Sequence, residues 1–270
     1  MALVRAEASS RTPPVKLHSG RDASMSYETV LYETQGGIAR ITMNRPEKHN
    51  ALNHQLLDDL DAAFARAGAD DDVSVVILAG AGPSFCSGYD NRTGSYYITP
   101  PDGKEAWTAP DALSALADIE QRYLRIWNCP KVTIARVHGA ALAGGCYLQL
   151  LCDISVAAES ARLGHPAPGV GSSSMPLWQV AMPLKKARYL LLTKRVIDGR
   201  TAERFDLVTM AVPDEELDAA IEDIAADCVR LGPVDARYKK TAYNGALEMM
   251  GLGAAFRYHS QMNAFARLVR

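Results

Sequence analysis

Apolar positions along the chain follow first the two-residue period of strands and then the longer period of helices. Two short runs, 28–32 and 38–43, are separated by Gln35-Gly36-Gly37, which predicts two strands joined at a glycine-rich turn. Apolar residues then recur at helical spacing from Leu56 to Ala67, with Asn50 or Asn53 as the expected cap. A nearly continuous apolar run at 73–79 follows, as expected for a buried parallel strand, so the order predicts an α/β crossover unit.

The same alternation continues to residue 158 and then gives way to helices. The further elements that it predicts are a helix from Leu113 to Ile126, a buried strand at 132–137, a helix from Gly144, a strand at 154–158, helices at 185–193 and 201–205, a short strand at 207–212, and three more helices. We therefore expect a core over 27–205 and a helical region over 206–270. Residues 1–26 lack periodicity, which predicts a disordered tail or an arm on a partner subunit.

The segment from Val137 to Asp153 combines a strand end, a turn of small residues and a helix that begins at Gly144-Gly145. Two glycines at a helix start let another molecule approach the backbone closely. The first N–H groups of the helix have no partner within it and attract negative charge. The segment therefore predicts a site that can hold an oxyanion.

Composition narrows the functional classes. The 270-residue chain is 48% apolar and 22% charged with a net charge of −2, which is typical of a globular protein and argues against binding to duplex nucleic acid. Its five cysteines are odd in number and contain no Cys-x-x-Cys, so we expect reduced core thiols and a cytoplasmic protein. No apolar run approaches the roughly 20 residues of a membrane span. The histidines form no metal-binding motif, so no metal site is predicted.

Four sets of residues occur in an informative order: Ile41-Thr-Met-Asn-Arg-Pro-Glu-Lys-His-Asn-Ala-Leu52, Phe85-Cys-Ser-Gly-Tyr-Asp90, His138-Gly-Ala-Ala-Leu-Ala-Gly-Gly-Cys146 with Cys152-Asp-Ile154, and Ile197-Asp-Gly-Arg-Thr-Ala202 with Leu207-Val208. Together they resemble the motifs of the crotonase (enoyl-CoA hydratase/isomerase) superfamily. The resemblance implies an α/β fold with a crotonase-like repeated ββα core and a helical C-terminal trimerisation region. It also implies a homotrimer or a hexamer made of two trimers.

The same resemblance implies an acyl-CoA thioester as the substrate, with coenzyme A as part of that substrate and no covalently bound cofactor. Two backbone N–H groups, those of Tyr89 and Gly144 by position, would hold the thioester oxygen in an oxyanion hole. Lys48, Ala51 and Ser87 fall where the family contacts the nucleotide part of CoA, although Lys48 is also explained as a solvated loop lysine.

The chain departs from the family pattern at both acid/base positions. Hydratases of this family use two glutamates, whereas this sequence has Tyr147 at the first position and Ala167 at the second. A carboxylate pair suits hydration because one carboxylate can hold a water while the other transfers a proton. Efficient hydration of an enoyl-CoA is therefore not expected.

Three side chains near the lost carboxylates are candidates for replacement chemistry. Tyr147 keeps a hydroxyl that could donate a proton, or is simply a packed aromatic. His165 could act as a base near neutral pH, or is a loop histidine bonded to backbone. Asp90 follows the first oxyanion donor and either orders its loop or faces the pocket.

Three functions remain open at this point. The first is a crotonase-type enzyme with altered chemistry on a CoA ester, such as isomerisation, decarboxylation or thioester hydrolysis. The second is a carbon–carbon bond hydrolase that cleaves a cyclic β-diketone, similar to 6-oxocamphor hydrolase, for which His165 would be the residue to test. The third is a non-enzymatic scaffold that kept the fold, although the Gly144-Gly145 and Ser87-Gly88 segments count against it.

Overall fold

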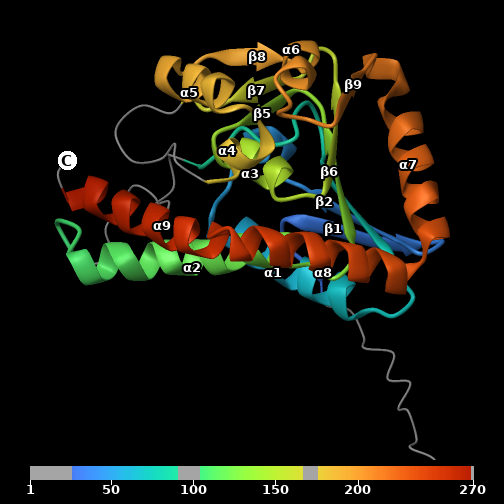
Figure 1. Cartoon of the computed structure of the whole chain (residues 1–270), viewed down its shortest axis with the longest axis horizontal. Coiled ribbons are helices and arrows are strands. Elements are labelled where there is room, and N and C mark those ends of the chain that lie inside the picture. Colours follow the sequence, from blue (N-terminus) through green and yellow to red (C-terminus); the bar gives the residue numbers. More distant parts are fainter. Residues whose placement is uncertain (1–25, 91–103, 167–175, 269–270) are drawn as a thin grey trace, which may run out of the picture.

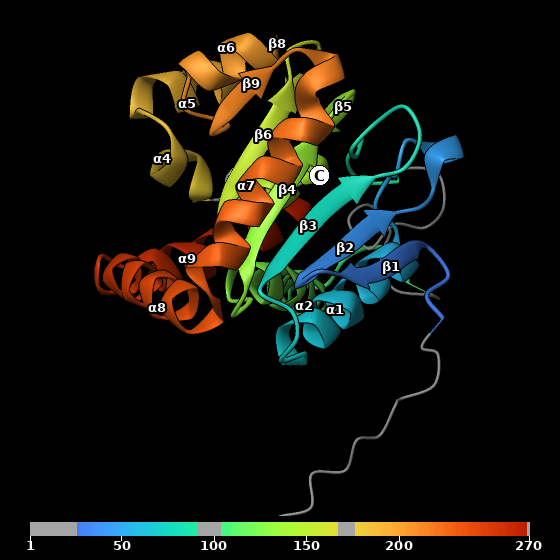
Figure 2. The ribbon, with the colours of Figure 1, turned by 90° about the vertical axis from the view of Figure 1, so that its right-hand side faces the viewer.

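The computed structural model describes residues 26–90, 104–166 and 176–268. A six-stranded sheet with the order β1-β2-β3-β4-β6-β9 forms its centre, as Figures 1 and 2 show. Its strands are β1 (Val30–Gln35), β2 (Ile38–Met43), β3 (Val75–Gly80), β4 (Val132–Val137), β6 (Ile154–Ala158) and β9 (Met210–Val212). Only the β1–β2 pair is antiparallel, because these strands form the hairpin expected at Gln35-Gly36-Gly37.

A second, three-stranded sheet lies beside the first and was not predicted from the sequence. It has the order β5-β7-β8, formed by β5 (Ala140–Leu142), β7 (Arg162–Gly164) and β8 (Val196–Asp198). Each strand is only three residues long, which is too short to carry a periodic pattern. The sheet matters to the site because β5 leads directly into α3.

Helices cover both faces of the large sheet and account for most of the remaining chain. They are α1 (His54–Ala69), α2 (Ala109–Trp127), α3 (Gly144–Leu150), α4 (Leu177–Ala181), α5 (Leu184–Thr193), α6 (Gly199–Arg204), α7 (Leu217–Leu231), α8 (Pro233–Met249) and α9 (Leu252–Leu268), with short 3₁₀ turns at Pro46–Lys48 and Asp214–Glu216. Helix α7 packs across β3, β4 and β6, as Figure 2 shows. This alternation of strands and helices confirms the expected α/β class.

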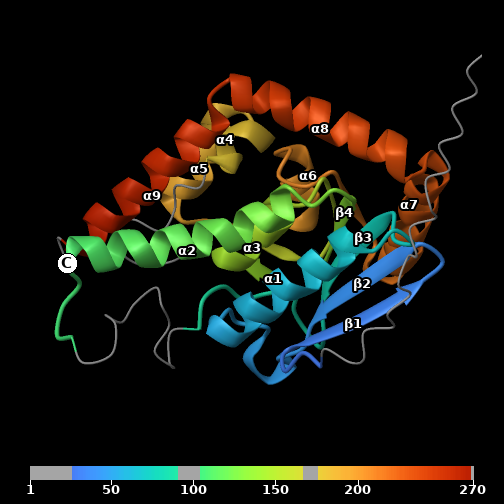
Figure 3. The same cartoon turned by 90° about the horizontal axis from the view of Figure 1, so that it is seen from below.

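The C-terminal helices fold back onto the core. Helix α8 crosses near β4, and α9 runs alongside α2, an arrangement visible in Figures 1 and 3. The large sheet includes β9, so residues after 205 contribute one strand to the core as well as helices. The predicted tail at 1–26 lies outside the described residues except for its last position.

Candidate active site

Two loops that follow parallel strands are fastened together by one buried amide. Asn50 accepts a hydrogen bond from the Arg45 backbone N–H at 2.9 Å and donates to the carbonyls of Ala81 at 2.9 Å and Ser84 at 2.7 Å. Asn50 therefore does not cap α1, and Asn53 does so by accepting from the Leu56 N–H. The loop after β2 and the loop after β3 form one unit as a result.

The three residues predicted to contact the nucleotide part of CoA lie together on these loops. The Ala51 N–H donates to the Lys48 carbonyl at 3.0 Å, and the Ser87 N–H donates to the His49 carbonyl at 2.9 Å. The Ser87 hydroxyl also lies 3.5 Å from the Lys48 carbonyl oxygen. The Lys48 side chain is exposed, so its ammonium group is available to a ligand. Their contact with CoA stays a prediction.

Asp90 forms a buried ion pair with Arg45. Their closest side-chain atoms, Arg45 Nη2 and Asp90 Oδ2, are 3.0 Å apart, and the side chains are 12% and 7% exposed. Arg45 also donates to the carbonyl of Ala51, so the pair joins the two loops a second time. This geometry gives Asp90 an ordering role, and its acid/base role stays a prediction.

The Tyr89 backbone is oriented by its neighbours on both sides. The Leu52 N–H donates to the Gly88 carbonyl at 2.7 Å, and the Asp90 N–H donates to the Leu52 carbonyl at 2.8 Å. In this parallel bridge Leu52 binds the residues before and after Tyr89, so the N–H of Tyr89 itself points away from Leu52. The bridge to Leu52 therefore does not use the Tyr89 N–H.

The start of α3 lies directly against the same loop. A Cβ atom placed on Gly145 would come within 2.1 Å of the Cys86 carbonyl oxygen, so only glycine permits this approach. A Cβ atom placed on Gly88 would lie 3.6 Å from the Gly144 nitrogen. The N–H groups of Tyr89 and Gly144 therefore belong to two segments in van der Waals contact, and their role as oxyanion donors stays a prediction.

Backbone strain accompanies this junction. Ala143, the residue before α3, has φ 48° and ψ −116°, a combination that L residues rarely adopt. Its N–H donates to the Gly164 carbonyl at 2.9 Å, which ties the strained residue to β7. The small sheet thus holds the start of α3 in place.

Two of the three acid/base candidates meet beside α3. The rings of Tyr147 and His165 stack with centroids 5.4 Å apart and an interplanar angle of 25°. Both residues are 2% exposed, so water has little access to them. The structure thus brings together two side chains that are 18 positions apart, while Ala167 lies outside the described residues.

A small cavity of about 30 Å³ adjoins Tyr89 and Tyr147. Helices α2 and α9 supply the rest of its lining, and the hydroxyl groups of Tyr89 and Tyr123 are hydrogen-bonded to each other. The lining residues from these helices are Leu116, Ile119, Glu120, Tyr123, Phe256, His259, Ser260 and Asn263. Sequence reasoning missed all of them, because helical spacing shows that a residue faces a core but not which distant helix faces it.

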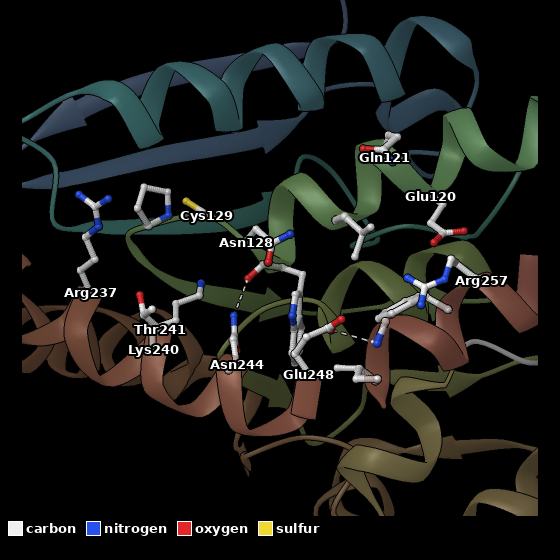
Figure 4. Close-up of a pocket in the computed structure, with 17 residues that line it drawn as sticks. Glu120, Gln121, Asn128, Cys129, Arg237, Lys240, Thr241, Asn244, Glu248 and Arg257 are labelled. Atoms are coloured by element: carbon white, nitrogen blue, oxygen red, sulfur yellow. Dashed lines mark hydrogen bonds between the residues drawn. The ribbon is translucent and has the colours of Figure 1, made fainter. Parts of the chain in front are cut away.

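A larger cavity of about 660 Å³ lies between α2, α8 and α9, as Figure 4 shows. Lys240 lines this cavity, and its ammonium group donates hydrogen bonds to Asp153 Oδ2 at 2.7 Å and to the Lys131 carbonyl at 3.1 Å. Asn244 lies 3.4 Å from the Trp127 carbonyl, across the space between α8 and α2. The residues that line this cavity do not include Tyr89, Gly144 or Tyr147.

The cysteines flanking the site are shielded. Burial raises the pKa of Cys86 and of Cys146 to about 12, which keeps both thiols protonated at neutral pH. All five cysteines are free, as the sequence predicted.

Within residues 26–90, 104–166 and 176–268, no group of three acidic, histidine or cysteine side chains could hold a metal ion. Over the same ranges no helix is both long and apolar enough to cross a membrane.

Comparison with known proteins was made on sequence and on structure. The family model described as enoyl-CoA hydratase/isomerase matches residues 33–266. A probable enoyl-CoA hydratase of Rhizobium meliloti is 37% identical over 232 residues, which cover 83% of this chain and 84% of the relative. A probable enoyl-CoA hydratase of Mycobacterium smegmatis has a crystal structure that matches with a TM-score of 0.80 and 31% identity, covering 88% of this chain and 94% of that one. An enoyl-CoA hydratase/isomerase of Xanthobacter autotrophicus matches with a TM-score of 0.79 and 32% identity, covering 89% and 88%.

Proposed function

The chain belongs to the enoyl-CoA hydratase/isomerase family, and from this premise we propose that it acts on an acyl-CoA thioester by way of an enolate. In this proposal the N–H groups of Tyr89 and Gly144 bind the thioester oxygen. A base removes a proton from the carbon next to the carbonyl, the electron pair of that C–H bond forms the carbon–carbon double bond of the enolate, and the π pair of the carbonyl moves onto the oxygen. Fixed N–H dipoles stabilise the charge, each being worth roughly 3 to 4 kcal/mol of barrier.

The observation that carries the proposal is the contact between the loop ending at Tyr89 and the first turn of α3. Gly145 approaches Cys86 more closely than any side chain would allow, and the strained Ala143 is held by the Gly164 carbonyl. Such strain persists only where the surrounding structure fixes it, and it is frequent at functional sites. The positive end of α3 adds to the attraction for an oxyanion.

Proton transfer in this proposal is assigned to Tyr147 and His165. Their stacked rings lie next to the candidate oxyanion hole in a site with little water, where a positioned proton donor or acceptor is effective. Replacing Tyr147 with Phe keeps the ring and removes the hydroxyl. If Tyr147 transfers the proton, we expect this variant to lose at least about 10²-fold in rate.

Exposed apolar side chains on α8 and α9 support assembly into a homotrimer or hexamer. Val234, Tyr238 and Met249 of α8 are each more than 70% exposed, and Tyr258 and Phe265 of α9 are at least 60% exposed. Side chains of this size gathered on neighbouring helices favour contact with another subunit. Light scattering of the purified protein measures the assembly directly.

The test of the proposal is exchange of the α-proton. A saturated acyl-CoA incubated with the protein in D₂O exchanges its α-hydrogen only if an enolate forms, whatever reaction follows, and NMR measures that exchange. We expect exchange, a rise in melting temperature with acyl-CoAs, and slow hydration of crotonyl-CoA. Hydration at or above about 10² per second would refute the expectation that replacement of the two glutamates by Tyr147 and Ala167 prevents efficient hydration.

A second function is favoured by the burial of His165 against Tyr147. A carbon–carbon bond hydrolase acting on a cyclic β-diketone needs a shielded histidine to activate water, and His165 is 2% exposed. The two functions differ in their ligands. If cyclic diketones raise the melting temperature and acyl-CoAs leave it unchanged, the second function replaces the first.

A further inference from the structure

Helix α9 places two polar side chains in the lining of the cavity that adjoins Tyr89 and Tyr147. They are His259 and Asn263, and His259 Nε2 lies 2.8 Å from Asn263 Nδ2. The remaining polar atoms of the pair, His259 Nδ1 and Asn263 Oδ1, are buried and have no hydrogen-bond partner among residues 26–90, 104–166 and 176–268. Buried polar atoms are paired in most native structures, so these two atoms require a partner from outside the described chain.

The pair offers one donor and one acceptor. The amide nitrogen of Asn263 donates to His259 Nε2, so the ring proton lies on Nδ1, which is a donor, while Asn263 Oδ1 is an acceptor. Turning the amide over reverses each role, and the pair again presents one of each. Burial lowers the pKa of His259 to about 4, so the ring is neutral near pH 7 in either arrangement.

The surroundings limit what can bind there. Leu116, Ile119 and Phe256 make much of the lining apolar, and the Ser260 hydroxyl is already bonded to the Glu120 carboxylate across the α2–α9 contact. The volume of about 30 Å³ exceeds the minimum of roughly 10 to 15 Å³ that one water needs. A small uncharged group therefore fits, whereas a carboxylate would leave the acceptor unpaired and an ammonium group would leave the donor unpaired.

We propose that His259 and Asn263 form a polar subsite that binds a hydroxyl group carried by the acyl chain of the substrate. A hydroxyl is the smallest group that donates one hydrogen bond and accepts another, which is what the pair requires. The subsite comes from α9, whereas the candidate oxyanion donors come from α3 and the loop before residue 90, so the hydroxyl lies beyond the reacting carbons. This inference rests on the proposed function, which it narrows to hydroxylated acyl-CoAs.

The experiment compares hexanoyl-CoA with its 4-hydroxy, 5-hydroxy and 6-hydroxy derivatives in calorimetric binding to the full chain. We expect hexanoyl-CoA to bind and at least one hydroxylated derivative to bind about 10-fold more tightly. The double variant His259→Leu with Asn263→Leu should lose that preference and bind the four thioesters with equal affinity. His259→Gln, which retains a donor and an acceptor, should keep part of it.

Two controls secure the result. Gln261→Ala changes an exposed residue of the same helix and should leave the preference intact. The double leucine variant should melt no lower than the wild type without ligand, because it removes unpartnered polar atoms from an apolar site. Equal affinity of the wild type for all four thioesters would overturn the subsite while leaving the proposed function in place. Failure of all four to bind would overturn the proposed function itself, and the subsite with it.

Discussion

Gly145→Ala tests the contact on which the candidate oxyanion hole depends. The added Cβ would lie 2.1 Å from the Cys86 carbonyl oxygen and 2.8 Å from the Cys86 carbonyl carbon, both of which are backbone atoms. Contacts of a real Cβ are essentially never shorter than 3.0 Å, so the loop and α3 must separate by about 0.9 Å, the difference between 3.0 and 2.1 Å. The substitution therefore widens the site without removing any polar group from it.

The magnitude follows from the sensitivity of catalysis to position. A displacement of about 1 Å in a reacting geometry can cost 10²-fold in rate, or about 2.7 kcal/mol of barrier. The same shift strains the bonds from the Cys86 N–H to the Ala140 carbonyl and from the Leu142 N–H to the Cys86 carbonyl, which are 2.8 and 3.0 Å long. Each such bond contributes about 1 kcal/mol to stability, so the melting temperature should also fall by several degrees.

The assay is α-proton exchange of a saturated acyl-CoA in D₂O at 25 °C, with circular dichroism to confirm that the variant is folded. Gly245→Ala is the matched control, because a Cβ there meets no atom within 4 Å and alanine favours the interior of α8. The control should exchange at the wild-type rate and be about 1 kcal/mol more stable. A Gly145→Ala protein that exchanges within threefold of wild type would refute the reasoning from the Cys86 contact.

Three further predictions concern stability and reactivity. Asp90→Asn leaves Arg45 buried without its counter-charge and should lower the free energy of unfolding by about 3 to 5 kcal/mol in urea titrations. Asp227→Asn is the control: it breaks an exposed ion pair with Arg230 and should change the free energy of unfolding by less than about 1 kcal/mol. Burial lowers the pKa of His259 from 6.5 to about 4, so as the pH falls the unfolded chain binds a proton before the folded chain does. The free energy of unfolding should therefore decrease between pH 6.5 and pH 4, by an amount on the order of 3 kcal/mol, and His259→Leu should remove this decrease. Equal pH dependence of stability in the two proteins would contradict the lowered pKa. Only Cys228, the one cysteine that is not fully buried, should react rapidly with a thiol reagent at pH 8 in the native protein, and Cys228→Ser should abolish that fast reaction.

The sequence was sufficient for the elements that have a long hydrophobic pattern. The strand expected at 132–137 and the helix expected from Leu113 to Ile126 are β4 and α2. The three-residue strands of the small sheet were missed because pairing with distant segments, and not local pattern, makes them strands. Tertiary contacts, and not local sequence, determine that these three segments are strands.

The site could be predicted only where motifs are continuous in sequence. Tyr89, Gly144 and Tyr147 were identified from segments of a few residues each, and the structure brings them to one place. His259 and Asn263 carry no comparable signal, because their spacing of four residues is common on any buried helix face. Their importance appears only when α9 is seen against α2 (Figure 3).

Packing of α9 along α2 also limits the order in which the elements of the protein can fold. The bond between Ser260 and Glu120 joins residues 140 positions apart, and α9 follows every other described element along the chain. During synthesis the two sheets and α2 can therefore assemble around the central core before α9 exists. Contacts so distant in sequence form late in folding, since closing a long loop costs entropy before any contact is gained. Until α9 has docked, the cavity lined by Tyr89 and Tyr147 lacks the wall that this helix supplies.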